Sequence, residues 1–186
     1  MTREGVPLLH FSEDPHIEHF VPHVPATNPD HPPAVWAIDA DHAPLYWFPR
    51  DCPRVTVWAD DAEQLTALHE RFTTTARRVH AAELGWLARN RAVELFVYEL
   101  PPATFRPWEP AYGQWISEVP VEPLGVTRAG DLLRRHAAAG IELRLVPDLH
   151  PLREAVLGSG LPFSMVRVHH RHGADARRPP PGTLTT

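Results

Sequence analysis

Lysine is absent from this 186-residue chain, in which all eighteen basic residues are arginine. Without lysine, the protein has no side-chain amine to form a Schiff base or to act as a lysine nucleophile. The single cysteine, Cys52, excludes an intramolecular disulfide. It also excludes a zinc site of the Cys₄ or Cys₂His₂ type.

Long apolar runs and the common phosphate-binding loops are also missing. No stretch approaches eighteen consecutive apolar residues, so no membrane span is expected. Residues 1–7 lack the basic-then-apolar layout of a secretory signal, which predicts a cytoplasmic location. Neither GxGxxG nor GxxxxGK[ST] occurs. A net charge of −5 and a pI near 6.2 argue against a nucleic-acid partner, which normally requires a basic face.

Proline is abundant instead, with 22 residues, about twice average usage. The prolines concentrate in residues 22–33, 101–123 and 179–181 and predict loops there, because proline lacks an N–H donor and disfavours helix before it. Residues 169–186 show no apolar period and are predicted to be a disordered tail. The remainder, residues 1–168, has the length and composition of a single globular domain.

The hydrophobic pattern predicts many short strands and few helices. Strands are expected at 7–11, 34–38, 54–59, 77–81, 94–100, 114–117, 122–128, 142–146 and 164–168. Helices are expected at 62–73, 82–89, 129–139 and 152–157, with Asp60 or Asp61 as the first N-cap and Gly140 ending the third helix. This irregular order predicts a mixed α+β fold with a bent or split central sheet and a few flanking helices.

Two strand-like runs carry polar side chains within apolar surroundings. His10 and Ser12 share one face of the first run, and Gln114 begins the second. Polar groups on otherwise apolar strands often line a ligand cleft, so we predict a pocket built from these distant segments. For His10, a buried histidine held by one backbone hydrogen bond is the structural alternative.

Several segments together form a recognisable pattern: His10–Pro15, Val35–Asp39, Phe48–Val55, Tyr98–Pro101, Trp115–Ser117 and Asp131–Leu133. The chain thereby resembles an uncharacterised bacterial family of small proteins, a domain of unknown function. The resemblance extends from about Leu8 to Val168, and the run at 48–54 is its most specific part. It implies no activity.

A more distant resemblance is to the ADP-ribosyltransferase-like superfamily, whose two small sheets enclose an NAD cleft. In that superfamily, a His on the first strand is followed by Gly and Ser or Thr, and a later strand carries a Glu. His10 and Ser12 match the first motif, although Phe11 replaces the Gly. Gln114 stands where the catalytic Glu would fall, and an amide cannot act as a general base. The resemblance then implies that transfer chemistry requires Glu118 or another acid, or that it is absent.

The same resemblance assigns the remaining parts of an NAD site. His10 would bind ribose hydroxyls, Ser12 would bind the nicotinamide amide, and Tyr46 or Trp36 would stack on a ring. Arg50 would neutralise the diphosphate, because a guanidinium binds phosphate in a bidentate manner. A salt bridge from Arg50 or its neighbour Arg54 to a nearby acid is the structural alternative.

Three alternatives to an NAD-dependent transferase follow from the residues. Replacement of Glu by Gln114 favours a non-catalytic protein that binds or senses a small ligand. His16, His19 and His23 have the spacing of one helical face, which is a weak metal pattern because Pro22 interrupts the helix. We assign no metal ligand. Arginines close to Cys52 in sequence favour a thiolate, but no paired base is evident.

Overall fold

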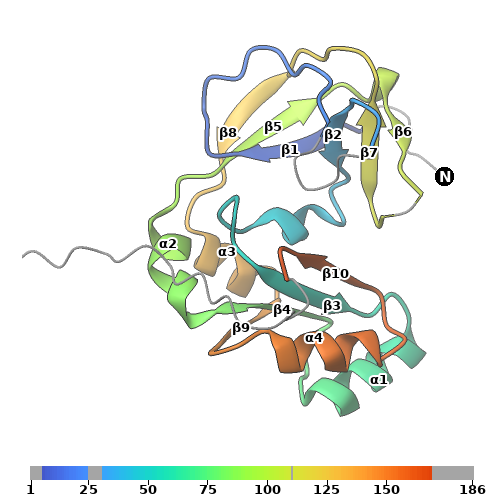
Figure 1. The fold of residues 1–186 in the computed structure, drawn as a ribbon, viewed down its shortest axis with the longest axis vertical. Helices are drawn as coiled ribbons and strands as arrows, with labels where there is room; N and C mark the ends of the chain where they lie inside the picture. The colour runs from blue at the N-terminus through green and yellow to red at the C-terminus, as the bar shows by residue number, and fades with distance from the viewer. Residues whose placement is uncertain (1–5, 25–30, 110, 169–186) are drawn as a thin grey trace, which may run out of the picture.

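The computed structural model describes residues 6–24, 31–109 and 111–168, which form two stacked β-sheets with helices between and beneath them (Figure 1). The predicted tail at 169–186 lies outside the described residues. Among the described residues, no helix is both long enough and apolar enough to cross a bilayer.

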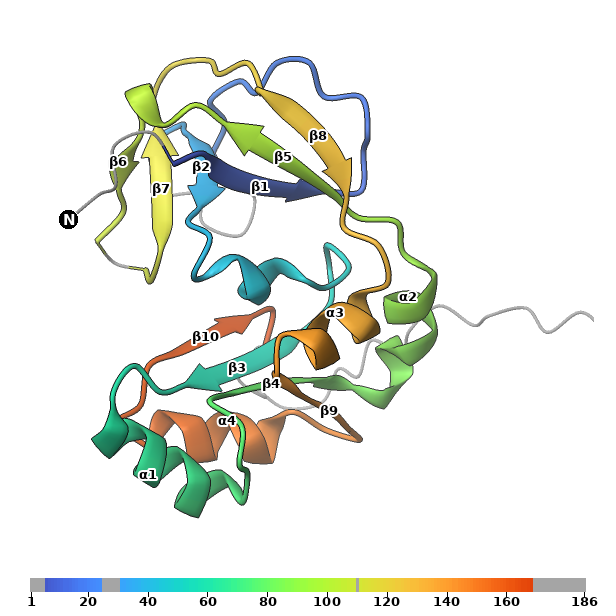
Figure 2. The same cartoon turned by 180° about the vertical axis from the view of Figure 1, so that it is seen from behind.

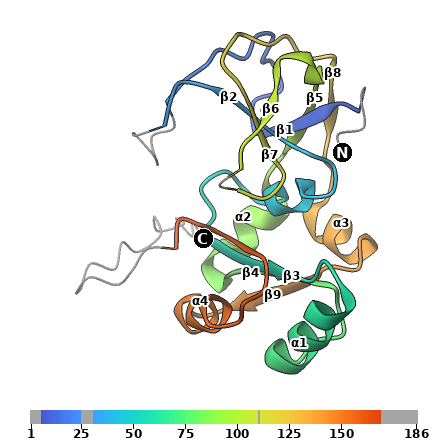
Figure 3. The ribbon, with the colours of Figure 1, turned by 90° about the vertical axis from the view of Figure 1, so that its right-hand side faces the viewer.

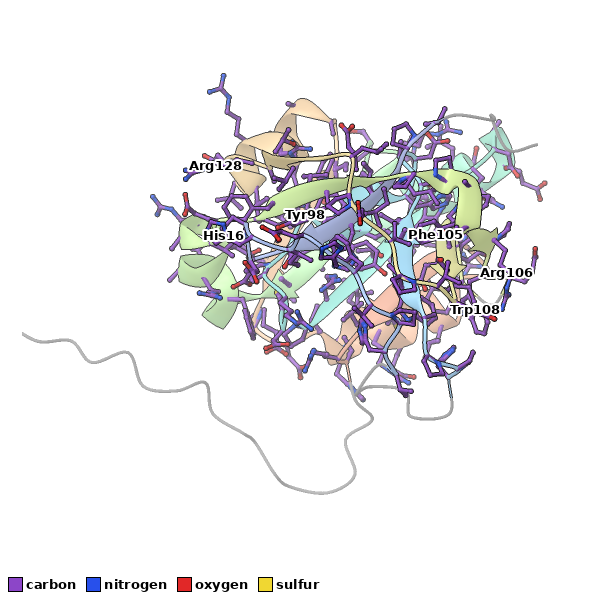
Figure 4. The ribbon with its side chains drawn as sticks, turned by 90° about the horizontal axis from the view of Figure 1, so that it is seen from above. His16, Tyr98, Phe105, Arg106, Trp108 and Arg128 are labelled. Atoms are coloured by element: carbon purple, nitrogen blue, oxygen red, sulfur yellow. The ribbon has the colours of Figure 1, made fainter. Side chains whose placement is uncertain are left out.

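The first sheet has six antiparallel strands in the order β6-β7-β2-β1-β5-β8. Their bounds are β1 Leu8–Ser12, β2 Val35–Ile38, β5 Phe96–Leu100, β6 Arg106–Pro107, β7 Gln114–Ser117 and β8 Gly125–Arg128. The outer face is apolar at Leu8, Val35 and Tyr98, and Phe20 from the loop after β1 packs onto it. Figure 4 looks onto this sheet, with Trp108 at one edge and Arg128 at the other.

The second sheet has four strands in the order β10-β3-β4-β9, and only β4 and β9 run parallel. Their bounds are β3 Arg54–Trp58, β4 Arg78–Glu83, β9 Glu142–Val146 and β10 Phe163–Val166. Helices α1 (Ala62–Phe72) and α4 (His150–Leu157) cover the face that is turned away from the first sheet (Figures 1 and 3). The apolar side chains of the two helices close the largest core cluster against Val55, Val57 and Val79.

Short helices fill the space between the sheets. The 3₁₀-helix η1 (Ala43–Tyr46) follows β2, while α2 (Leu87–Ala92) and α3 (Leu132–Ala138) lie together at one side of the layer (Figure 2). Two further 3₁₀ turns, Leu84–Trp86 and Pro102–Thr104, complete the elements. Trp47, directly after η1, packs with Val93 and Leu132 into the core between the sheets.

The predicted mixed α+β class is confirmed, and the strands divide into two sheets. The helix predicted at 82–89 begins too early, because Ala82 and Glu83 continue β4. The third helix is shorter than predicted, because Gly130 adopts φ +75° and Asp131 caps the helix from outside. Strand β8 likewise starts only at Gly125, after Pro123.

Candidate functional site

A small cavity opens where the pairing of β1 with β2 stops. These strands share one residue pair, Leu9↔Ile38, whereas β1 pairs with β5 along its whole length. The cavity has a volume of about 70 Å³ and is lined by Leu9, His10, Phe11, Trp36, Ala37, Ile38, Tyr46 and Gln114. Four of the seven predicted site residues therefore meet here, and three strands and the turn η1 bring them together.

His10 closes the gap between the two strands. Its Nδ1 donates a hydrogen bond to the carbonyl oxygen of Trp36 at 2.8 Å, in place of the missing backbone pairing. The ring packs on Phe20, with centroids 4.8 Å apart, on the outer face of the sheet. Burial lowers the pKa of His10 below its ordinary value, although the bond to Trp36 acts in the opposite direction. The single backbone hydrogen bond of the structural alternative is present, and His10 also lines the cavity.

Gln114 and Tyr46 form the polar wall of the cavity. The Gln114 amide Nε2 donates to the Tyr46 hydroxyl at 2.9 Å. Burial raises the pKa of the Tyr46 phenol, so the hydroxyl keeps its proton at neutral pH. The strand register places Gln114 on the same face as Ile38 and Leu9, opposite to the face of His10. His10 and Gln114 therefore meet at one cavity without facing one another.

A much larger groove of about 530 Å³ shares Gln114 with this cavity. Its lining comes from the end of β2 and from the β6–β7 hairpin: Asp39, Pro107, Trp108, Glu109, Ala111, Tyr112, Gly113, Gln114 and Trp115. This volume lies within the range of small-molecule sites, whereas the cavity alone is below it. Together, the groove and the cavity form the composite site of this protein.

Aromatic rings held by other rings form the walls of the groove. The edge of Trp36 meets the ring of Trp108, with centroids 5.7 Å apart, and His31 meets the same ring at 4.8 Å. Tyr112 packs against the edge of Trp58 at 5.2 Å. Trp108 and Tyr112 are therefore oriented before any ligand arrives, and Tyr112 is 52% exposed.

The Asp39–His42 pair fixes the end of the groove. Asp39 Oδ1 accepts from both the backbone N–H and the ring Nδ1 of His42, each at 2.8 Å. Burial tends to raise the pKa of Asp39, but these hydrogen bonds outweigh it and hold the pKa below its usual range. Gly113 has φ +66°, and a Cβ there would lie 2.4 Å from the His42 ring. The hairpin backbone thus approaches His42 as only glycine permits.

Among the described residues, the lining of the groove carries acids and no basic side chain. Asp39 and Glu109 supply two carboxylates. The guanidinium of Arg106 on β6 is engaged by Glu118 at 2.7 Å. That of Arg78 lies 5.4 Å from the Trp58 ring centroid and donates to a backbone carbonyl. The formal charge of the lining is therefore negative.

The other three predicted site residues lie outside both the cavity and the groove. The Ser12 hydroxyl is buried and accepts from the backbone N–H of Asp14. Arg50 is exposed, and its backbone N–H donates to the Glu13 carboxylate. Glu118 follows the end of β7 at Ser117 and pairs with Arg106.

The predictions around Cys52 also need correction. Asp51 pairs with Arg167 at 2.6 Å, not with Arg50 or Arg54. Burial raises the pKa of the Cys52 thiol to about 11, so it is not a thiolate at neutral pH. Arg54 is buried and donates to the carbonyl oxygens of Leu45 and Cys52. The closeness of Arg54 to Cys52 in sequence does not produce a thiolate, because the Arg54 side chain turns toward η1 within the core.

No metal site is present within the part of the chain that the structure describes. There, no three His, Cys, Asp or Glu side chains lie close enough together to hold one ion. His16 and His19 lie in coil and His23 forms an isolated bridge with Ala34, so the helical face that would align the three does not form.

Comparison with known families places the chain in one of them. A family model described as a family of unknown function, DUF6886, matches residues 9–171. The chain belongs to DUF6886. No curated protein and no solved structure matches it. The resemblance to an uncharacterised family is thereby confirmed, and the function of this DUF6886 protein has to be argued from its site.

Proposed function

We propose that this DUF6886 protein binds a small, ring-bearing or alkylated ligand at the composite site, without chemical turnover. The observation that carries the proposal is the shared Gln114, which joins a preorganised aromatic groove of ligand size to a polar cavity. Rings held in place before binding lose little conformational entropy when a ligand arrives, which favours affinity.

Absence of turnover follows from the side chains at the site. The Gln114 amide cannot act as a general acid or base at neutral pH, and Tyr46 is a protonated phenol. The Asp39 carboxylate is already bonded to His42. Glu109 is the one carboxylate of the described lining that these contacts leave unengaged. General acid–base chemistry ordinarily requires a free acid and a free base within reach of one reacting atom, and Gln114, Tyr46 and Asp39 do not supply the second group.

A ligand panel tests the proposal. The panel contains nucleosides, nucleotides, sugars, amino acids and amines, and hits from thermal shift are measured by calorimetry. We expect hits whose affinity falls about 5- to 30-fold in Tyr112→Ala, because a lost aromatic wall costs about 1–2 kcal/mol. Gln114→Met should also weaken binding. Mass spectrometry of the incubated ligand should show no change.

The matched control is Leu124→Ala, because Leu124 is equally prominent on the surface, 62% exposed, and lies before β8. Its affinity for every hit should equal that of the parent protein. Hits that bind equally well to Tyr112→Ala and Gln114→Met would place the ligand elsewhere and contradict the proposal. A ligand converted to product would contradict the absence of turnover.

An ADP-ribosyltransferase-like enzyme that uses NAD is the second candidate. Its support is limited to the lining of one cavity by His10, Tyr46 and Gln114, and the opposite faces that His10 and Gln114 occupy in the sheet count against it. Against it stand the ion-paired, remote position of Glu118 and the two carboxylates that a diphosphate would meet in the groove.

Incubation with labelled NAD separates the two candidates. The enzyme predicts nicotinamide release that is abolished in His10→Ala, raised in Gln114→Glu and lowered in Glu118→Gln. Saturable binding with intact NAD, or no interaction at all, supports the non-catalytic protein.

A further inference from the structure

We propose that the groove selects an organic cation, a small molecule whose alkylated ammonium group lies between the aromatic walls beside the carboxylates. This inference rests on the proposed function and names the chemical class of its ligand. It commits to positive charge, which distinguishes the ligand from neutral sugars and nucleosides and from phosphorylated compounds.

The aromatic walls provide the first part of the argument. Trp108 and Tyr112 line the groove, and the negative faces of such rings attract cations. The protein already uses this contact next to the groove: the Arg78 guanidinium lies 5.4 Å from the centroid of Trp58. Trp58 in turn packs edge-on with Tyr112 at 5.2 Å. The ring that supports Tyr112 therefore already contacts one cationic group, the guanidinium of Arg78.

The carboxylates provide the second part. Asp39 is ionised at neutral pH, because its hydrogen bonds to His42 lower its pKa despite burial. Glu109 has no ion-pair partner among the described residues, in contrast to Glu118 and Glu122, which face Arg106 and His19. Two carboxylates on one concave surface attract a cation and repel an anion more strongly than they would on an open surface.

The absence of basic side chains from the lining provides the third part. Among the residues that the structure describes, no arginine lines the groove. The nearest in sequence, Arg106, is engaged by Glu118. Arg78 lies outside the lining, although its charge interacts with Asp39. A bound phosphate or carboxylate would therefore meet carboxylates and no guanidinium among the described lining residues, whereas an ammonium group would meet both aromatic rings and acids.

Matched pairs of probes test charge at constant shape. Choline is compared with 3,3-dimethylbutan-1-ol, in which carbon replaces nitrogen, and benzyltrimethylammonium is compared with neopentylbenzene. Calorimetry should show the cation of each pair binding at least tenfold more tightly than its neutral partner. Raising the salt concentration from 50 to 500 mM should weaken the binding of the cationic probes only, because salt screens the attraction between charges. AMP serves as the anionic probe and should not bind.

Variants connect the selectivity to the groove. Glu109→Gln and Asp39→Asn should each lower the affinity for the cations several-fold and leave the affinity for their neutral partners unchanged. Asparagine at position 39 retains an oxygen that can accept from His42. Trp108→Leu should weaken the cations by tenfold or more. The control Glu122→Gln removes a carboxylate that is 79% exposed and outside the groove, and it should have no effect.

The outcomes separate the two proposals. Neutral partners that bind as tightly as the cations, in a manner dependent on Tyr112, would overturn the cation inference and leave the small-ligand function in place. Binding of AMP at the groove would also overturn the cation inference and leave the small-ligand function in place. Failure of every probe and every panel ligand to bind in a Tyr112-dependent manner would overturn both.

Discussion

Arg54 is a buried charge without a carboxylate partner among the described residues. Its guanidinium donates to two backbone carbonyls, Leu45 at 3.0 Å and Cys52 at 3.2 Å, and lies near the faces of Tyr46 and Phe48. Burial lowers the pKa of Arg54, yet an arginine remains charged at any physiological pH. The residue therefore stabilises the irregular backbone around η1 and not a ligand.

Arg54→Met should destabilise the protein by about 2–4 kcal/mol. The substitution leaves two carbonyl oxygens without their donor, at about 1–3 kcal/mol each, and part of this cost is offset because a charge no longer has to be buried. Urea unfolding measures the change. Arg91→Met, at an exposed arginine, is the control and should stay within about 0.5 kcal/mol of the parent. Equal stability of the two variants would contradict this role.

Gly113 is the residue on which the shape of the groove depends most directly. Gly113→Ala combines a left-handed backbone, φ +66°, with a Cβ placed 2.4 Å from His42. We expect a loss of about 1–3 kcal/mol in stability, together with weaker ligand binding as His42 is displaced from Asp39. Gly85→Ala is the control, since a Cβ at Gly85 meets nothing within 4 Å. That variant should be neutral or slightly stabilised.

At the scale of elements, the sequence predicts the bounds of helices and strands correctly where interactions within a few residues determine them. Strands β7 and β9 have the predicted bounds, and α1 starts after Asp61 as expected. The predicted bounds are wrong where a strand passes directly into a helix, as at Glu83, because alanine and glutamate suit helices and it is the pairing of β4 with β3 and β9 that keeps Ala82 and Glu83 extended. Strand β6 is two residues long and depends on pairing with β7.

The cap of α1 is a testable element-scale feature. The Asp61 carboxylate accepts from the Gln64 N–H at 2.8 Å, while the Gln64 side chain accepts from the Asp60 N–H. Asp61→Ala should cost about 1 kcal/mol, the usual value for a lost N-cap. Thermal or urea unfolding measures it. Glu70→Ala, at an exposed position near the other end of the same helix, should be neutral, and an equal loss there would argue against a specific cap effect.

At the scale of the whole molecule, two histidines connect the lower sheet to the layer between the sheets. His136 of α3 donates from Nδ1 to the Leu132 carbonyl at 2.7 Å, so its Nε2 accepts from Nδ1 of His80 on β4, 3.1 Å away. His80 Nε2 is buried without a partner among the described residues. The charged neighbours of the pair are all positive: Arg54 on β3, Arg78 on β4 and Arg135 on α3.

This pair should make the protein sensitive to acid. Burial, and then neighbouring positive charge, lower the pKa of His80 well below 6.5, and burial also lowers the pKa of His136. The unfolded chain therefore binds more protons than the folded protein below about pH 6.5, so stability is full above that pH and falls as the pH decreases. Each proton contributes a slope of up to about 1.4 kcal/mol per pH unit.

Urea unfolding between pH 7.5 and 5 measures this dependence. The double variant His80→Leu/His136→Leu should show a flatter pH profile than the parent, whatever its absolute stability. His16→Gln, at an exposed histidine, should keep the slope of the parent. Parallel profiles for the parent and the double variant would show that the acid sensitivity arises elsewhere.

The sequence by itself determined the α+β class, most element positions and the absence of lysine chemistry and of an intramolecular disulfide, and it predicted that His10, Trp36, Tyr46 and Gln114 meet at one cavity. These follow from side-chain periodicity, capping and composition, which act over a few residues. Tertiary structure alone decided the aromatic groove, because Asp39 and residues 107–115 meet only through the pairing of β2 with β7. It also decided the burial of Arg54, the surface position of Glu118 and the contact of His80 with His136 across 56 positions, since such long-range packing leaves no periodic trace in the chain.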